Sequence, residues 1–168
     1  GELDVYLLQP KDPLFHILVS RTEVSAWGDL AYGLVLLPFL TLDPVKMALF
    51  LLFTVTGALV FVAFFSLVGS LAFWWGNIEG LSGALTEFLL SFTLYPDTVF
   101  PKEMRWVFYS VVPAGFLAFL PLRVLRDLDW VWLPVVVGAA AALLVAAWAA
   151  FAAGVRRYES GNALGGRV

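Results

Sequence analysis

The sequence predicts an all-α membrane protein with four transmembrane helices. Hydrophobic residues make up 61% and charged residues 14% of the 168 residues, whereas soluble domains contain roughly 45–50% and about 25%. A soluble domain of this length would have too few polar residues to cover its surface. Four apolar stretches also approach the roughly 20 residues that a helix needs to cross the hydrocarbon of a bilayer. These observations place the chain in a membrane.

The four expected spans differ in strength. Residues 130–155 form the clearest span, because they are uncharged and rich in alanine. The first span is the weakest, because Asp29 and three helix breakers interrupt it. Pro113 and Pro121 predict that the third span is short and kinked. The expected bounds of the spans are 24–42, 47–69, 106–122 and 130–155.

Two Asp-Pro pairs and one amphipathic segment mark further features of the helices. Asp12 and Asp43 are each followed by proline, so each predicts an N-cap carboxylate with a proline in the first helical turn. The first pair opens a short helix at about 13–20, and the second opens the span at 47–69. Residues 80–95 place apolar side chains at helical spacing and polar ones on the other faces. This pattern favours an amphipathic helix lying in the membrane interface.

The distribution of basic residues predicts the orientation. Both ends of a chain with four crossings lie on the same side of the membrane, and seven of the 10 basic residues belong to the segments on that side. Because cytoplasmic loops carry the excess of Lys and Arg, both ends are expected in the cytoplasm. The domains are then a cytoplasmic segment at 1–23 and a transmembrane domain at 24–168, which ends in a cytoplasmic tail at 156–168.

Several kinds of chemistry are excluded by the residues that the sequence lacks. It has no cysteine, which removes disulfides, thiolate metal sites and cysteine nucleophiles. Its one histidine, His16, cannot by itself form a metal cluster or a Ser-His-Asp triad. A net charge of −3 does not provide the excess of positive charge that nucleic-acid binding requires. The sequence also has no Gly-rich phosphate-binding loop. The sequence therefore predicts no enzyme activity, no cofactor, no metal and no nucleic-acid partner.

Polar groups within the spans are candidate functional residues, because such groups are costly in a bilayer. Asp29 is the only ionisable residue well within an expected span, and a position at the interface is favoured over a role as substrate ligand. Hydroxyl groups in the second span could line a substrate path, although such groups more often bond to their own helix or to a neighbouring one. They belong to Thr54, Thr56, Ser66 and Ser70. Alanines at 139–150 favour close packing, within the chain or with a second subunit.

Three separated motifs resemble one family of membrane transporters. The chain opens with GELDVYLLQPKDPLF, continues through Tyr95-Pro96 to Phe100-Pro101 before an Arg-Trp helix, and ends with GVRRYESGN. In order and spacing these motifs resemble the permeases of ATP-binding-cassette (ABC) type-2 exporters, and most closely the bacterial six-span branch without an ATPase domain of its own. The resemblance implies that two spans precede this chain, which agrees with a first residue, Gly1, that is not methionine.

The resemblance also implies partners, a location and a site. The chain would be the permease subunit of an ATP-driven exporter in the bacterial cytoplasmic (inner) membrane, together with a second permease subunit and a separate ABC ATPase subunit. The segment 1–23 would be a cytoplasmic coupling segment, whose helix abuts the ATPase subunit. Members of this family are often described with extracellular helices before the last span. Here only residues 123–129 lie between the third and fourth expected spans, so any such helix would have to include residues from 113–122. The motif residues that match at the ATPase contact are Glu2, Leu3, Asp4, Leu7, Pro10, Pro13, Leu14 and Phe15.

Two other interpretations stay open at this point. A non-transporting membrane scaffold or assembly subunit would share the spans but would have no ATPase partner. An ion-coupled secondary carrier would use Asp29 and Glu87. Such carriers keep carboxylates near the middle of the membrane, and the second and fourth expected spans have none. Ion coupling is therefore the less favoured of the two.

Overall fold

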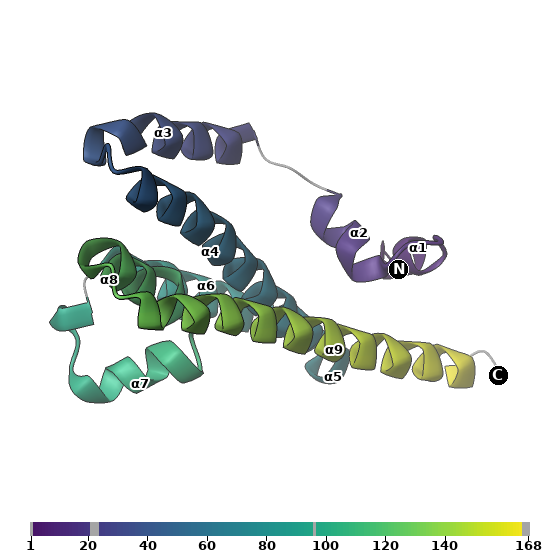
Figure 1. Ribbon diagram of the computed structural model, residues 1–168. Coiled ribbons are helices and arrows are strands. Elements are labelled where there is room, and N and C mark those ends of the chain that lie inside the picture. The colour runs from purple at the N-terminus through teal and green to yellow at the C-terminus, as the bar shows by residue number, and fades with distance from the viewer. Residues whose placement is uncertain (1, 21–23, 96, 166–168) are drawn as a thin grey trace. The chain divides into compact units, whose positions relative to one another are not determined.

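The computed structural model describes residues 2–20, 24–95 and 97–165, and in these ranges every regular element is a helix (Figure 1). The all-helical class predicted from the sequence is confirmed. The chain divides into two compact units, residues 1–47 and 48–168, which are described one at a time. The first unit contains α1 (Glu2–Leu7), α2 (Pro13–Val19), α3 (Val24–Leu40) and the start of α4 (Pro44–Ser70).

Two aspartates begin helices in the first unit, as the sequence predicts. The Asp12 carboxylate accepts a hydrogen bond of 2.8 Å from the Phe15 amide, and Pro13 occupies the first turn of α2. The Asp43 carboxylate accepts a bond of 2.9 Å from the Val45 amide at the start of α4. Each carboxylate satisfies a donor that the start of a helix leaves unpaired. These caps fix where the two helices begin.

The second unit contains the rest of α4 and the elements that follow it. Two helical stretches, Pro44–Trp75 and Trp130–Tyr158, are long and apolar enough to cross a membrane, in agreement with the second and fourth expected spans. In the first unit α3 is apolar too, but its 17 residues are fewer than the roughly 20 that a span needs. Four crossings therefore stay a prediction. The remaining elements are α5 (Ala72–Trp75), α6 (Glu79–Leu94), η1 (Asp97–Val99), α7 (Lys102–Ser110), η2 (Gly115–Phe119), α8 (Leu120–Asp127), η3 (Trp130–Trp132) and α9 (Leu133–Gly165).

The third expected span, residues 106–122, is interrupted at residues 111–114, which we call the break. The helix α7 ends before it, and the helical stretch Gly115–Asp127 leaves it at 90° to α7. Pro113 has no N–H to offer the Tyr109 carbonyl, so a helix loses a hydrogen bond and kinks or ends at this point. The next turn, η2, is a π-helix. The predicted kink is confirmed, but its size turns the span into a bent pair of helices. With that pair counted as one span, the described residues hold up to three spans.

Phenylalanine rings fill the core of the second unit. The Phe108 ring is fully buried, and its centre lies 4.5 Å from that of Phe92 in α6 and 4.9 Å from that of Phe100. Phe119 in η2 completes the group, with its ring centre 5.5 Å from that of Phe108. Such ring pairs contribute about 0.5–1.5 kcal/mol each beyond the area that they bury. The group joins α6, α7 and η2, so packing as well as Pro113 holds the bend.

The helix α6 matches the amphipathic helix expected at 80–95. Leu89 and Phe92 are buried and belong to the phenylalanine-rich core. Phe88 and Leu94 are exposed. One side of α6 therefore packs on the protein, while exposed apolar groups of this kind suit contact with lipid at the interface.

The corner between α8 and α9 is held by an ion pair and a cation–π contact. Leu128 ends α8 in the left-handed conformation, with φ 51°. Arg123 Nη2 lies 3.7 Å from Asp129 Oδ2, and the Arg123 guanidinium lies 5.2 Å from the centre of the Trp132 ring. Exposed contacts of these kinds contribute about 1 kcal/mol or less each. They orient the corner more than they stabilise the fold.

The helix α8 precedes the last long helix and begins at Leu120, within residues 113–122. Its end, outside the expected spans, carries a pair of neighbouring charges. The Arg126 guanidinium donates hydrogen bonds of 2.9 and 3.0 Å to the Asp127 carboxylate. These bonds hold the pKa of Asp127 below its ordinary value. The carboxylate therefore stays ionised at neutral pH beside its arginine.

Near its C-terminal end, α9 contacts α5 through a glycine (Figure 1). Gly154 has no side chain, and the Phe73 ring packs directly on its backbone, where a β-carbon would overlap the ring. Phe151 and Tyr158 contact that ring edge to face, with ring centres 5.7 and 6.4 Å from that of Phe73. Gly154 and Tyr158 belong to the GVRRYESGN motif. This motif therefore holds α5 against the last helix.

Gly154→Ala should make the folded chain less stable than Gly138→Ala. Both changes lie in α9, and both gain about 0.5–1 kcal/mol because alanine suits a helix better than glycine. An added β-carbon at Gly138 meets nothing within 4 Å, whereas at Gly154 the Phe73 ring must move. Overpacking of this kind costs about 1–3 kcal/mol. Thermal unfolding of both variants in one detergent measures the difference.

A Phe73→Ala background provides the control for this prediction. Without the ring, an alanine at position 154 has room, so the difference between the two glycine variants should shrink toward zero. Equal melting temperatures for Gly154→Ala and Gly138→Ala in the otherwise unchanged chain would contradict the packing of Phe73 on Gly154.

Candidate functional site

Two regions carry candidate functional residues: the helices α1 and α2, and an apolar pocket in the second unit. In the first region, α1 and α2 are held together by their side chains. The Tyr6 and His16 rings meet edge to face with centres 5.2 Å apart, and the Tyr6 hydroxyl donates to Ser20 Oγ at 3.4 Å. Ser20 Oγ in turn donates to the Ile17 carbonyl at 2.8 Å. We call the two helices the α1–α2 pair.

The residues predicted to contact an ATPase subunit all fall on the α1–α2 pair or on the turn within it. The side chains of three of them, Glu2, Leu3 and Asp4, lie outside the described part of the structure. The positions divide between α1 (Glu2, Leu3, Asp4 and Leu7), the turn (Pro10) and the first turn of α2 (Pro13, Leu14 and Phe15). The sequence motif thus corresponds to one local helical unit.

Apolar side chains are exposed on the α1–α2 pair. Phe15 exposes 65% of its surface, and Leu8 and Leu18 are exposed as well. Leu14 is half-buried. Exposed apolar groups gathered in one place indicate contact with another protein or with lipid. Among the predicted apolar contacts whose side chains the structure describes, Phe15 is the one most available to a partner.

His16 lies inside the α1–α2 pair. Its ring contacts Tyr6, and its Nδ1 atom is buried without a hydrogen-bond partner among the described residues. This position suits a packing role. Within the described ranges, no three or more His, Asp or Glu side chains gather where they could hold a metal ion.

The hydroxyl groups proposed for a substrate path bond along their own helix. Thr54 and Thr56 donate to carbonyls about one turn earlier in α4, at 2.9 and 3.3 Å. Ser70 Oγ donates to the Ser66 carbonyl at 2.6 Å. Thr54 is exposed, whereas Thr56 and Ser70 are buried, so the four residues do not share one surface. A path along them stays a prediction.

The two carboxylates that an ion-coupled carrier would use are both exposed. Asp29 lies on α3 in the first unit, and Glu87 lies on α6 in the second. Neither is enclosed by side chains of its own unit, so each lacks the closed setting of an ion-binding carboxylate.

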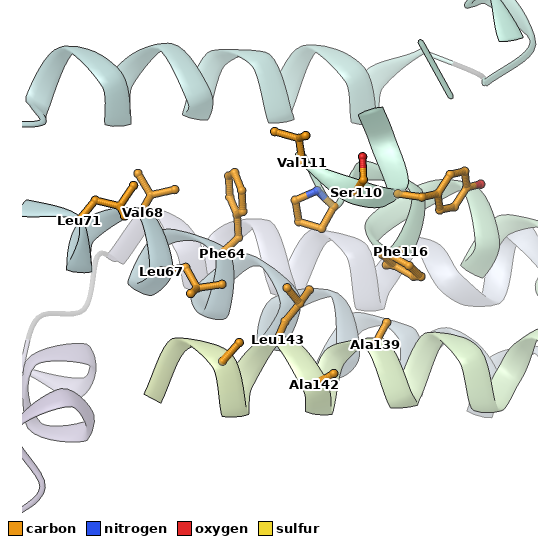
Figure 2. A pocket seen from close by; sticks show the side chains of 13 residues that line it. Phe64, Leu67, Val68, Leu71, Ser110, Val111, Phe116, Ala139, Ala142 and Leu143 are labelled. Atoms are coloured by element: carbon orange, nitrogen blue, oxygen red, sulfur yellow. The ribbon is translucent and has the colours of Figure 1, made fainter. Parts of the chain in front are cut away.

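An apolar pocket of about 570 Å³ lies in the second unit (Figure 2). Its volume falls within the roughly 300–1,000 Å³ typical of small-molecule sites. Three parts of the chain form its walls: the C-terminal end of α4, the break with its flanking turns, and the middle of α9. The lining residues are Phe64, Leu67, Val68 and Leu71 from the first wall, Tyr109, Ser110, Val111, Pro113 and Phe116 from the second, and Ala139, Ala142, Leu143 and Ala146 from the third.

Small residues on α9 give the pocket its room. Ala139, Ala142 and Ala146 follow one another at three and four residues, so they lie on one face of the helix. Ala140 and Ala147 are buried, as close packing requires. The alanine-rich span therefore serves both packing and the pocket. Sequence reasoning missed the pocket, and the available signal was this alanine spacing together with Pro113.

Comparison with known proteins identifies the family. The family described as ABC-2 family transporter protein matches residues 1–162. The chain belongs to the ABC-2 transporter family. The match covers the α1–α2 pair and all three walls of the pocket. No curated protein and no solved structure matches the chain.

Membership in the ABC-2 transporter family confirms the resemblance seen in the three motifs. Proteins of this family are membrane components of transporters and are not themselves catalytic. The chain is therefore a membrane-embedded transport protein, in agreement with its long apolar helices. The two candidate regions are best considered in that setting.

Gly115→Ala should destabilise this ABC-2 protein more than Gly57→Ala. An added β-carbon at Gly115 would overlap the Tyr109 ring, which is part of the pocket wall, whereas at Gly57 it would lie 3.8 Å from Leu117 Cδ2, an ordinary contact. The overlap should cost about 1–3 kcal/mol. Titration with SDS should therefore unfold Gly115→Ala at a lower detergent fraction. Adding Tyr109→Ala should remove most of the difference, and equal SDS midpoints for the two glycine variants would contradict the contact.

Proposed function

We propose that the chain is the permease subunit of an ATP-driven ABC exporter, in which a separate ATPase subunit contacts the α1–α2 pair. The observation that carries the proposal is the ABC-2 family match over residues 1–162. ATP hydrolysis needs a phosphate-binding loop rich in glycine, and these 168 residues contain none. In the proposal these residues do not hydrolyse ATP, and the separate ATPase subunit that the family resemblance implies does so.

The proposed topology has four crossings with the α1–α2 pair and the C-terminal tail in the cytoplasm of a bacterium. The excess of basic residues on the terminal side supports this orientation, since seven of the 10 lie there. The two long stretches, Pro44–Trp75 and Trp130–Tyr158, supply two crossings. We assign the other two to α3 and to the bent pair that contains the break.

The proposed coupling depends on contact between the ATPase subunit and a compact α1–α2 pair. The Asp12 cap and the contact between Tyr6 and His16 hold the pair together. A partner shifts a two-state equilibrium only by the difference between its affinities for the two states. A compact pair presents the ATPase with a defined surface in each state. Nucleotide-dependent movement could then favour the inward or the outward opening of two permease subunits.

Phe15→Asp should uncouple ATP hydrolysis from transport, because it places a charge on the most exposed aromatic group of α2, where Phe15 shows 65% of its surface. Removing an apolar anchor from an interface costs about 1–3 kcal/mol of contact free energy, so coupled transport should fall by about tenfold or more. Leu14→Asp should have a similar effect. The measurement is substrate-stimulated ATP hydrolysis together with export in reconstituted vesicles.

Phe15→Leu is the matched control for this prediction, because it keeps an apolar group at the same position. It should retain most of the coupled transport, and all variants should insert in the membrane to the same extent. Export at the unmodified rate by both Phe15→Asp and Leu14→Asp would show that the ATPase subunit does not dock here.

Lys11→Cys should be labelled by a membrane-impermeant maleimide only from the cytoplasmic side. The 168 residues contain no cysteine, so the introduced thiol is the one target in this region. Asp127→Cys, on the opposite side in the proposed topology, serves as the reversed control. In intact cells we expect labelling of Asp127→Cys alone, and in inverted membrane vesicles labelling of Lys11→Cys alone. Labelling of Lys11→Cys in intact cells would overturn the orientation.

A further inference from the structure

We propose that the apolar pocket between α4, the break and α9 binds the hydrocarbon chain of the transported substrate, so that the substrate is an amphiphile with such a chain. The inference rests on the proposed function, because it gives the pocket a place on the transport path. It assigns a class of substrate from the chemistry of the pocket walls.

The walls select for hydrocarbon. None of the residues that line the pocket is charged, and apart from Ser110 and Tyr109 their side chains are apolar. A charged group moved into such surroundings would lose hydration without gaining a partner. The volume of about 570 Å³ is also large for a single side chain or a few waters. A flexible apolar chain suits these walls best.

One end of the pocket offers hydrogen-bond acceptors. The Ala114 amide bonds to the Val112 carbonyl at 2.8 Å, so it does not make the helical bond to the Ser110 carbonyl. The Ser110 hydroxyl donates to the Trp106 carbonyl at 2.7 Å, which leaves its oxygen able to accept a bond. Ser110 lines the pocket. The preferred amphiphile therefore carries a donor such as a hydroxyl, an amine or an amide next to its chain.

The break makes one wall of the pocket different from the other two. Interrupted helices within a membrane are tolerated where their irregular backbone is buried in protein or lines a cavity. Here the irregular residues Val111 and Pro113 line the pocket directly, and Figure 2 shows Val111 on this wall. The other walls are the long continuous helices α4 and α9. A wall built on a break can change its angle during transport, which favours a site for cargo over a site for a fixed structural lipid.

The test uses the complete permease with its co-purified partners in lipid nanodiscs. The probe is a long-chain alcohol that carries a photoreactive diazirine on its chain, so that its hydroxyl supplies the donor next to the hydrocarbon. Labelled positions are mapped by mass spectrometry. We expect saturable labelling at residues 64–71 and 139–146. Ala142→Phe fills the pocket and should lower the labelling by about tenfold. The control is Ala141→Phe, at the preceding position of α9. Ala141 is exposed and does not line the pocket, so this variant should be labelled as strongly as the unmodified chain.

A second measurement separates cargo from a resident lipid. Trapping the complex with ATP and vanadate should lower the labelling of a transport site at least several-fold, because the site then changes its opening. Saturable labelling that does not respond to ATP and vanadate would identify a resident lipid and would overturn the proposal. Labelling that is not saturable, or is equal in Ala142→Phe and the unmodified chain, would overturn it as well.

The proposed function fails by a different observation, namely a permease that co-purifies with no ATPase subunit from native membranes. That result would also remove the role of the pocket in transport. The comparison of Ala142→Phe with Ala141→Phe would still decide whether the pocket binds a hydrocarbon chain. The two failures are therefore distinguishable.

Discussion

Where a helix breaks within an apolar medium, its free backbone N–H and C=O groups must find hydrogen-bond partners inside the protein. The packing of the second unit around the break depends on this constraint. Pro113 removes a donor from the helical pattern. The amides of the first two residues of the break share the Val107 carbonyl at 3.0 Å, and two amides after the break share the Pro113 carbonyl at 3.1 Å. Backbone amides that lose their usual carbonyl acceptor thus bond to a neighbouring carbonyl. The buried Phe108 ring packs with Val112 and Ala114 of the break in one core cluster, so that most of the irregular backbone lies within the protein.

The pocket is a consequence of the same break. A straight third span would lie along its neighbours, whereas a bend of 90° leaves space beside α4 and α9. Small side chains on α9 keep that space open, because each alanine ends at its β-carbon. The Tyr109 ring, packed on Gly115, fixes the third wall. Stability and a binding site therefore depend on the same few residues around the break, as is expected where function requires a departure from regular structure.

Local features of this protein could be predicted from the sequence, and features that depend on distant contacts could not. The caps at Asp12 and Asp43 and the long helix at 130–155 depend on neighbouring residues, and the structure has them where expected. Pro113 indicated a kink, but the angle depends on rings that come from separate helices. The pocket draws its walls from three parts of the chain, and the contact of Gly154 with Phe73 joins two more. The contact of Gly154 with Phe73 leaves no periodic signal, and the pocket leaves only the alanine spacing on one of its three walls.

The helix α4 begins in the first unit and reaches the pocket in the second. It runs without interruption for 27 residues, which corresponds to roughly 40 Å at about 1.5 Å per residue. Its first turn follows the Asp43 cap, and its last turns line the pocket through Phe64, Leu67 and Val68. A continuous helix resists bending, whereas the break interrupts regular hydrogen bonding in the opposite wall. A displacement of α4 would therefore be taken up at the break, and the pocket would change shape there. Under the proposed function, a movement passed along α4 would then change the pocket at the break.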